Sequence, residues 1–455
     1  MMRPLSLSEL RLPLDGQLHG DDCDILGVST DSRTLHDGDL FVALRGEHFD
    51  GQEYVAQANS VGATAALVRQ VVASSLPQLQ VADTQRALGL LGAYNRQQYK
   101  GPLIGITGSS GKTTVKNMVH AVLSRRGETL ATEGNFNNEI GVPLTLLRLR
   151  PGVEFAVVEM GAAKAGDIAW LCELACPTIA LLLNAMPAHL EGLTSVEGVA
   201  AAKGEIFDRL VKTDVAVINA DQSWARQWRK RASAATVMDF GLEQPASITA
   251  RNIQGMGVRG VSFTASTPVG DMSIRLNLAG VHNVANALAA VAVGLACELS
   301  LTDVRDGLES LQPSDGRLRS MVSPLGASII DDCYNANPGS VRAAIDMLAA
   351  CSGRRTLLLG AMRELGRGSS ELHREVGEYA RAAGIDQLWG VGPELEICVD
   401  AFGAGGRYFE DRAAALVDIE RQFGEGDTVL IKGSRSAGME QVLHALLPNI
   451  KAQEH

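Results

Sequence analysis

The sequence predicts an α/β protein of three domains, in which a central, doubly wound and mainly parallel sheet carries a phosphate-binding loop. Three observations support this fold class. Apolar runs of strand length alternate with segments of helical periodicity along most of the 455 residues. The run IGITGSSGKTT joins one such strand to a helix through a glycine-rich turn. The same alternation resumes after the turn-rich segment QPSDGRLR, which indicates a domain boundary.

The first domain, residues 1–82, is expected to be a small α/β unit. The segments DLFVAL, AALV and LQV are predicted to be short strands, and EYVAQANSVGA is predicted to be the helix between the first two.

The central domain, residues 83–312, begins with a predicted helix at TQRALGLLGAYNRQQ. The strand PLIGITG and the helix KTTVKNMVHAVLSRRG follow, and further strands are predicted at FAVVE, TIALLL and VAVIN. Since a segment of helical periodicity separates each pair of strands, we expect a mainly parallel sheet. Around 246–279 the pattern changes to alternating β-type segments, and a strongly apolar helix, VHNVANALAAVAVGLACEL, comes next.

The third domain, residues 313–455, repeats the strand-and-helix rhythm. Strands are predicted at SIIDD, TLLLG, QLWGVG and TVLIKGS, with helices between them. This alternation predicts a Rossmann-like unit.

The composition excludes several classes of function. No basic segment precedes a long apolar run at the start, and no stretch of about 18 apolar residues occurs, so we expect neither export nor membrane insertion but a cytoplasmic protein. A net charge of −11 without a basic cluster argues against nucleic-acid binding and favours a small-molecule substrate. Seven scattered cysteines indicate buried, reduced thiols, and we expect a monomer.

The glycine-rich turn has the features of a phosphate-binding loop. Its glycines allow the backbone N–H groups from Gly108 to Lys112 to turn toward phosphate oxygens, and the following helix adds its positive N-terminal end. Lys112 can reach the β- and γ-phosphates, and the Thr113 hydroxyl can bind Mg²⁺. Ile106 stands where the common pattern has glycine, so this is the shorter T-G-x-x-G-K-T form. The predicted nucleotide-binding residues are Thr107, Gly108, Ser109, Ser110, Gly111, Lys112, Thr113 and Thr114.

Three further residues decide the chemistry. Glu159 ends the strand FAVVE, at the sheet edge where open α/β sheets bind ligands. His189 follows the strand TIALLL, and Lys203 lies on a probable helix among small residues. Taken alone, such residues more often have no catalytic role: Glu159 would be a solvated residue at a turn, His189 a structural or exposed histidine, and Lys203 a surface charge.

The stretches TGSSGKTT, VVEMGA, AHLEG, AAKGEIF, GVHNVANALAA and DGR occur in this order and resemble the signature of the Mur ligase family. This resemblance extends from about residue 25 to about residue 440. It implies an ATP-dependent ligase that joins an amino acid or peptide to a UDP-linked muramoyl peptide through an acyl phosphate. HNVAN without the family would equally suit helix capping or a buried amide network.

The resemblance also implies roles for individual residues. Lys112, Lys203 and His189 would act in catalysis, with two Mg²⁺ ions held by Thr113, Glu159, His189 and a CO₂-derived carbamate on Lys203. Further contacts to ATP would come from Asn283, Asn286, Arg317 and Asp331.

Motifs outside the shared signature distinguish the members of the family from one another. The stretches TEGNFNNEIGVPLTLL and IIDDCYNANPGS resemble the member that adds D-alanyl-D-alanine to UDP-N-acetylmuramoyl tripeptide. STDSRTLHDGDLFVALRGEHFDG looks like a segment that binds the uridine nucleotide. The implied substrate-binding residues are Thr30, Asp31, Ser32, Arg33, Glu47, His48, Phe49, Asn135, Asn137, Asn138, Asn335, Asn337, Lys432, Ser434 and Arg435.

Several alternatives stay open at this stage. Asp31, Ser32 and Arg33 suit a type I turn as well as a nucleotide, and turn formation alone would explain two of the three asparagines of the GNFNNEIG loop. A folylpolyglutamate synthetase would share the central motifs, although the STDSR segment and this loop speak against it. From another class, a nucleotide-dependent switch without covalent chemistry would need no Lys203.

Overall fold

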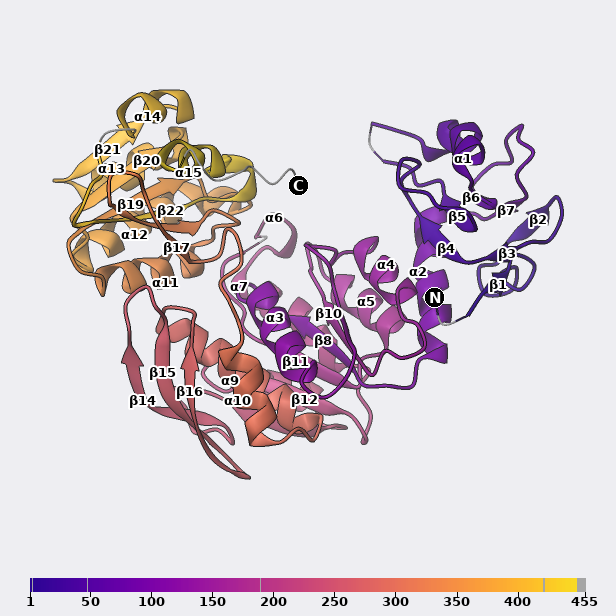
Figure 1. Ribbon diagram of the computed structural model, residues 1–455, viewed down its shortest axis with the longest axis horizontal. Helices are drawn as coiled ribbons and strands as arrows, with labels where there is room; N and C mark the ends of the chain where they lie inside the picture. Colours follow the sequence, from indigo (N-terminus) through magenta and orange to yellow (C-terminus); the bar gives the residue numbers. More distant parts are fainter. Residues whose placement is uncertain (2, 47, 189, 420–421, 448–455) are drawn as a thin grey trace.

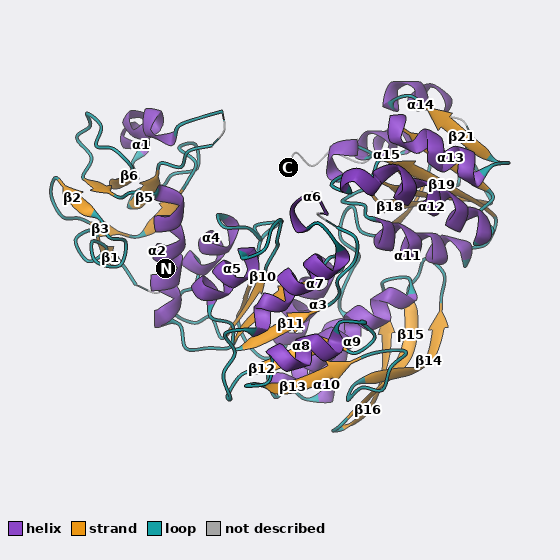
Figure 2. Ribbon diagram, turned by 180° about the vertical axis from the view of Figure 1, so that it is seen from behind, coloured by secondary structure: helices purple, strands orange, loops and turns teal. Residues whose placement is uncertain are grey.

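The computed structural model describes residues 1, 3–46, 48–188, 190–419 and 422–447. Figures 1 and 2 show three α/β units in a row, with the N-terminal and C-terminal units at opposite ends and the central unit between them. The predicted fold class is therefore confirmed.

The N-terminal unit is built on a five-stranded sheet with the strand order β2-β7-β6-β5-β4. β4, β5, β6 and β7 run parallel, and β2 is antiparallel to β7. The strands are β2 (Gln17–His19), β4 (Gly27–Ser29), β5 (Asp39–Val42), β6 (Ala65–Val68) and β7 (Gln78–Gln80). The 3₁₀ turn η1 (Gly51–Tyr54) and α1 (Val55–Val61) connect β5 to β6, and β1 (Leu5–Ser6) pairs with β3 (Asp24–Ile25).

Helix α2 (Thr84–Gln98) leads into the central unit. Asp83 caps it, because its carboxylate accepts hydrogen bonds from the backbone N–H groups of Gln85 and Arg86. The guanidinium of Arg86 lies 4.9 Å from the ring centre of Trp170 on α5 (Asp167–Ala175), so the first turn of α2 packs against the central unit.

The central sheet is six-stranded and entirely parallel, in the order β13-β12-β11-β8-β10-β9. Its strands are β8 (Leu103–Thr107), β9 (Thr129–Ala131), β10 (Phe155–Glu159), β11 (Ile179–Leu182), β12 (Val215–Asn219) and β13 (Thr236–Phe240). The intervening helices are α3 (Lys112–Leu123), α4 (Gly141–Leu147), α5 (Asp167–Ala175), α6 (Leu190–Leu193), α7 (Val196–Gly204), η2 (Glu205–Phe207) and α8 (Ala225–Arg231). The strand order reverses beside β8, which creates a ligand-binding crevice at its carboxyl end.

Both faces of this sheet are buried. Along β10, Val157 faces one core, and its neighbours Ala156 and Val158 face the other. Helices α3 and α9 (Val281–Ala296) cover the first face, and α5 and α7 cover the second. This explains why the strands are almost wholly apolar rather than alternating.

A three-stranded antiparallel sheet follows, and it packs on α9 from the other side. It consists of β14 (Thr249–Gly255), β15 (Val261–Thr267) and β16 (Gly270–Leu276), and α10 (Leu301–Glu309) closes this part of the chain. In β15, Val261, Phe263 and Ala265 are buried, and the residues between them are less so. The alternating pattern predicted around 246–279 is therefore that of a sheet with one buried face.

The C-terminal sheet has the order β17-β18-β22-β19-β20-β21 and is parallel except for β17. The strands are β17 (Arg319–Val322), β18 (Ser328–Asp332), β19 (Arg354–Gly360), β20 (Gln387–Val391), β21 (Gly406–Phe409) and β22 (Asp427–Lys432). The helices are α11 (Pro338–Ala349), η3 (Gly366–Gly368), α12 (Ser369–Ala382), η4 (Pro393–Leu395), α13 (Glu396–Phe402), α14 (Arg412–Ile419), η5 (Arg435–Ala437) and α15 (Glu440–Leu446).

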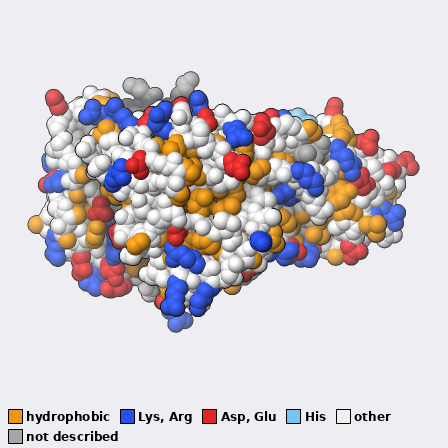
Figure 3. All heavy atoms as spheres, turned by 90° about the horizontal axis from the view of Figure 1, so that it is seen from below, with side chains coloured by type: hydrophobic (Ala, Val, Ile, Leu, Met, Phe, Trp, Pro, Cys, Tyr) orange, Lys and Arg blue, Asp and Glu red, His pale blue; other side chains and the backbone are white. Residues whose placement is uncertain are grey.

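The distribution of charged side chains and the burial of the cysteines can be compared with what the composition predicted. Figure 3 shows acidic and basic side chains interspersed over one face of the molecule. No helix in the described part of the chain is long and apolar enough to cross a bilayer. All seven cysteines are free, but only Cys172, Cys333 and Cys398 are buried and Cys176 is exposed, so the expectation of buried thiols holds in part.

Candidate active site

The phosphate-binding loop lies between β8 and α3, at the crevice of the central sheet. Gly111 precedes α3 and has a φ of +83°, in the left-handed region that glycine adopts without strain. A Cβ atom at this position would lie 2.8 Å from Oδ1 of Asn286 on α9. Glycine is therefore needed here both for the backbone and for the close approach of α9.

The neighbouring Asn184 holds the loop in place. Its side-chain amide makes two hydrogen bonds with Ser110, donating to the carbonyl at 3.0 Å and accepting from the N–H at 2.9 Å. Its own carbonyl accepts from the N–H of Ser109 at 3.1 Å. Asn184 thus already engages the N–H groups of Ser109 and Ser110, and the expectation that they turn toward phosphate oxygens stays a prediction.

Lys112 lies at the first position of α3. Its ammonium donates to the carbonyl of Gly108 at 2.8 Å, across the loop that it is expected to serve. Burial lowers the pKa of Lys112, while the nearby charge of Glu159 raises it. Incoming phosphate oxygens would offer this ammonium a stronger partner than a neutral carbonyl.

Glu159 is a buried carboxylate of the site, with 2% of its surface exposed. Its Oε2 accepts a hydrogen bond from the Thr113 hydroxyl at 2.9 Å, and its Oε1 accepts from the Asn137 side chain at 2.8 Å. Its backbone N–H donates to the hydroxyl of Thr132 at 3.0 Å. Carboxylate and hydroxyl oxygens therefore meet where the chain could hold Mg²⁺.

Lys203, on α7, has 1% of its surface exposed. Burial lowers the pKa of this lysine well below its usual value, and the charge of Lys112 lowers it further. The surface-charge interpretation is wrong for this residue. A neutral amine is the form that reacts with CO₂, so the chemistry of the site suits a carbamate.

The amides of α9 form a small network. Asn283 donates to the carbonyl of Ala279 at 2.7 Å, and its Oδ1 accepts from Asn286 at 3.0 Å. Both side chains also line the central cavity, so the network leaves them within reach of a ligand.

On the C-terminal side, Asp331 organises the DGR turn. Its carboxylate accepts from the N–H of Gly316 at 2.8 Å and from the N–H of Cys333 at 3.1 Å. The guanidinium of Arg317 then lies 4.0 Å from the ring centre of Tyr334. A cation–π contact of this kind restricts the guanidinium to one face of the ring.

The polar residues at the edge of the C-terminal sheet differ in whether their side chains already form hydrogen bonds within the protein. Asn337 caps α11, since its Oδ1 accepts from the N–H of Ser340 at 2.9 Å. Ser434, which is 4% exposed, has a hydroxyl without a hydrogen-bond partner among the described residues. Of these two, Ser434 is the one available for a substrate.

Lys432 and Asp332 form a buried ion pair with an Nζ–Oδ2 distance of 2.5 Å, and Nζ also donates to the carbonyl of Asn335 at 2.9 Å. Lys432→Met should lower the free energy of unfolding by about 3–5 kcal/mol, because it leaves the Asp332 carboxylate buried without a partner. Urea denaturation followed by circular dichroism measures this. Adding Asp332→Leu should recover much of the loss, and an additive double variant would contradict the pairing.

Most of these residues surround one cavity of about 1680 Å³ that separates the central sheet from the C-terminal sheet. The expected residues that line it are Ser109, Ser110, Gly111, Lys112, Thr113, Thr114, Asn135, Asn137, Asn138, Glu159, Asn283, Asn286, Arg317, Asp331, Asn335, Asn337, Lys432, Ser434 and Arg435. Thr107, Gly108 and Lys203 are not in its lining. His189 and Glu47 lie outside the described residues.

The N-terminal candidates lie apart from this cavity, which none of Thr30, Asp31, Ser32, Arg33, His48 and Phe49 lines. Asp31 and Arg33 form an ion pair at 2.6 Å, and the N–H of Thr34 donates to the carbonyl of Asp31. The turn that was considered as an alternative is therefore present, and binding of a uridine nucleotide there stays a prediction.

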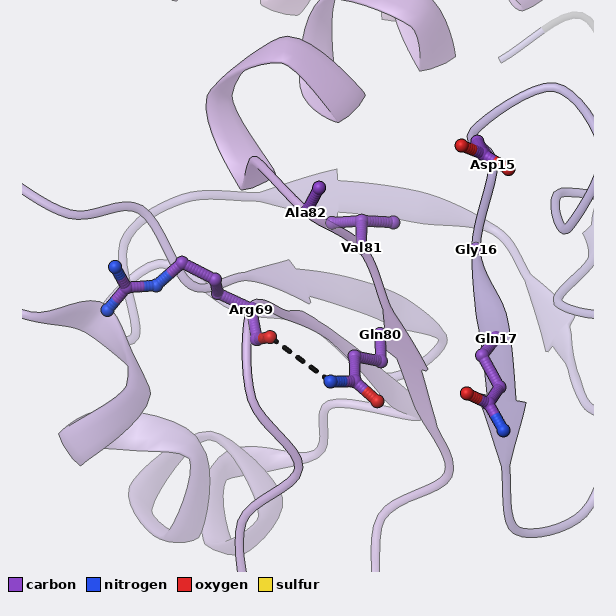
Figure 4. A pocket seen from close by; sticks show the side chains of 7 residues that line it. All are labelled: Asp15, Gly16, Gln17, Arg69, Gln80, Val81 and Ala82. Atoms are coloured by element: carbon purple, nitrogen blue, oxygen red, sulfur yellow. Dashed lines mark hydrogen bonds between the residues drawn. The ribbon is translucent and has the colours of Figure 1, made fainter.

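A smaller hollow of about 390 Å³ lies on the N-terminal unit, beside β2 and β7 (Figure 4). Its polar walls come from Asp15, Gln17, Arg69 and Gln80, and the side chain of Gln80 donates to the carbonyl of Arg69 at 3.3 Å. No residue predicted from the sequence lies in it, so the cavity between the two sheets is the candidate site.

Four of the polar residues that the sequence analysis missed are notable for their contacts or charge. Asn184, Lys116, His282 and Tyr334 all line the cavity. Asn184 lies two residues after the end of β11, so the rule that drew attention to His189 would have found it. Burial, together with the charge of Lys432, lowers the pKa of His282 to about 4, so this imidazole is neutral near pH 7.

Comparisons with known proteins agree with this geometry. Three family models match the chain, with the descriptions "Mur ligase family, catalytic domain" at residues 24–93, "Mur ligase middle domain" at 106–294 and "Mur ligase, glutamate ligase domain" at 316–435. The chain belongs to the Mur ligase family. Among the relatives of this Mur ligase, the UDP-N-acetylmuramoyl-tripeptide--D-alanyl-D-alanine ligase of Escherichia coli is 44% identical, covering 98% of this chain and 99% of the relative. The Haemophilus influenzae enzyme of the same name is 40% identical over 99% of this chain and 100% of its own length.

Solved structures give the same result. A crystal structure of MurF from Acinetobacter baumannii has a TM-score of 0.93 at 35% identity and covers 98% of this Mur ligase and 100% of that chain. MurF ligase from Thermotoga maritima, solved in complex with ADP, has a TM-score of 0.81 at 28% identity, covering 92% and 96%. A folylpolyglutamate synthase from Mycobacterium tuberculosis is 21% identical, so that likeness extends to the fold alone.

Proposed function

We propose that this Mur ligase joins D-alanyl-D-alanine to UDP-N-acetylmuramoyl tripeptide at the expense of ATP, a step in peptidoglycan synthesis. One observation carries the proposal. The chain is 44% identical, over 98% of its length, to the Escherichia coli enzyme that bears this activity in its name. The geometry supports it, because the phosphate-binding loop and the polar edge of the C-terminal sheet face one cavity.

The reaction needs two substitutions in sequence. The terminal carboxylate of the tripeptide attacks the γ-phosphorus of ATP, a new O–P bond forms, the bond to the β-phosphate oxygen breaks, and ADP leaves. The unprotonated amine of D-alanyl-D-alanine then attacks the acyl carbon, the amide bond forms, inorganic phosphate leaves and the amine gives up a proton. Lys112 neutralises charge on the transferring phosphoryl group, and Asn283, Asn286 and Arg317 position ATP.

The oxygen ligands of the described residues support a Mg²⁺ site, at which we expect two ions. Thr113 and Glu159 offer oxygen ligands at the cavity wall, His189 is expected to add a nitrogen, and the lowered pKa of Lys203 favours its conversion to a carbamate. When bound, the ions supply positive charge to the phosphates. Thr113 and Asn137 meanwhile hold the Glu159 carboxylate in one orientation.

The remaining expectations concern the substrates and their surroundings. We expect the N-terminal segment at Thr30–Arg33 and 47–49 to bind the uridine nucleotide and the residues at 335–337 and 432–435 to bind the peptides. This division corresponds to domains at 1–82, 83–312 and 313–455. Closure of the third domain would exclude water from the acyl phosphate. We also propose that the protein acts as a cytoplasmic monomer.

One assay tests the activity. Purified protein with ATP, Mg²⁺ and UDP-N-acetylmuramoyl tripeptide should release ADP at a sustained rate only when D-alanyl-D-alanine is present. Mass spectrometry should then show the tripeptide substrate gaining the dipeptide less one water. ADP release that is indifferent to the dipeptide, without this product, would show that the assignment is wrong.

A further inference from the structure

Lys116 is a buried lysine on α3 that has no role in the proposed reaction. It lies one helical turn after Lys112 and has 5% of its surface exposed, at the wall of the cavity. Its ammonium donates to the carbonyl of Thr132 at 2.7 Å and is 3.5 Å from the carbonyl of Gly134. A lysine ammonium has three donors and no acceptor, so it is suited to hold backbone carbonyls.

The segment that Lys116 holds begins directly after β9, and its sequence is TEGNFNN. Gly134 within it has a φ of +50°, and the asparagines that follow favour turns over regular structure. Two of its residues reach Glu159: the Thr132 hydroxyl accepts from its backbone N–H, and the Asn137 side chain donates to its carboxylate. The segment therefore fixes the position of the Glu159 backbone and the orientation of its carboxylate.

These contacts form a closed ring. Thr113 and Lys116 lie three residues apart on α3 and so share one face of the helix. Thr113 donates to Glu159, Glu159 donates to Thr132, and the carbonyl of Thr132 accepts from Lys116. Lys116, Thr132 and Glu159 are all at least nine-tenths buried, where hydrogen bonds are stronger than in water.

We infer that Lys116 is a positioning residue, which anchors the loop at 132–138 to α3 and thereby orients Glu159 for the metal. This consequence for catalysis rests on the proposed ligase chemistry, whereas the anchoring itself does not. Residues that orient metal ligands typically change metal affinity or activity by about 10–100-fold when they are replaced.

Lys116→Met tests the inference, since methionine keeps most of the volume and removes the charge and the donors. Amide hydrogen exchange in 132–138 should become about 10-fold faster, and binding of Mn²⁺ with ADP, followed by electron paramagnetic resonance, should weaken about 10-fold. Lys116→Arg should retain more of both properties. Neither measurement uses a peptide substrate, so this inference and the proposed function fail separately.

Arg96 provides a matched control. It is also a buried cation, and it donates to the carbonyls of Ala175, Tyr99 and Cys176 away from the cavity. Arg96→Met should lower thermal stability without changing Mn²⁺ binding or exchange in 132–138. Unchanged metal binding in Lys116→Met, or the same changes in Arg96→Met, would overturn the inference.

Discussion

Lys203→Ala should lower the rate of ligation by about 10³-fold, because it removes the only amine from which the proposed carbamate can form on α7. Short carboxylic acids added to the assay should restore part of the rate, since they can supply the missing carboxylate in the space that the truncation opens. The measurement is ADP release in the presence of both substrates, with and without acetate. A rate equal to that of the unchanged protein would exclude the carbamate mechanism.

Lys203→Met shows whether a loss of ligation activity comes from the missing amine or from loss of folding. The folded-state pKa of Lys203 is lowered, whereas the unfolded chain takes up a proton with an ordinary pKa near 10.5. Between these two values the unfolded state binds more protons, so the stability of the metal-free protein falls as pH falls through this window. Methionine has no titrating amine, so the Lys203→Met variant does not lose stability in this way as the pH falls. In CO₂-depleted buffer its Tm should exceed that of the unchanged protein, and by more at pH 7 than at pH 10.

Lys112→Met should lower kcat/KM for ATP by about 10²–10³-fold. Its ammonium is the cation of the phosphate-binding loop, it donates to the carbonyl of Gly108, and no neutral side chain can replace its charge at the phosphates. ADP affinity should fall as well, which isothermal titration calorimetry measures. The exposed Lys212 provides the control, because it lies outside the cavity lining and Lys212→Met should leave both quantities unchanged.

The strands predicted from the sequence are mostly the buried inner ones. β8, β10, β11, β12, β18, β19, β20 and β22 are apolar runs because sheet neighbours and helices cover them. The strands without a prediction, such as β4, β13, β17 and β21, lie at sheet edges. In β13 only Phe240 is fully buried, so its sequence lacks the apolar run or alternation from which a strand is predicted.

The phosphate-binding loop, Glu159 at the end of its strand and the order of the three units were determined by the sequence alone, because turn chemistry and periodicity act between near neighbours. The family resemblance then indicated Lys203. Only the tertiary structure decided that this lysine is buried and that its pKa is lowered, since burial depends on α7 packing against the central sheet.

The partners of the site were likewise decided by the tertiary structure. Asn184 holds Ser110 from 74 residues away, and Lys432 pairs with Asp332 across 100 residues. Lys116 contacts a carbonyl that β9 brings beside α3. Such contacts form only when parallel strands set their carboxyl ends side by side, and a linear pattern of residue types does not specify which polar groups will then lie within hydrogen-bonding distance.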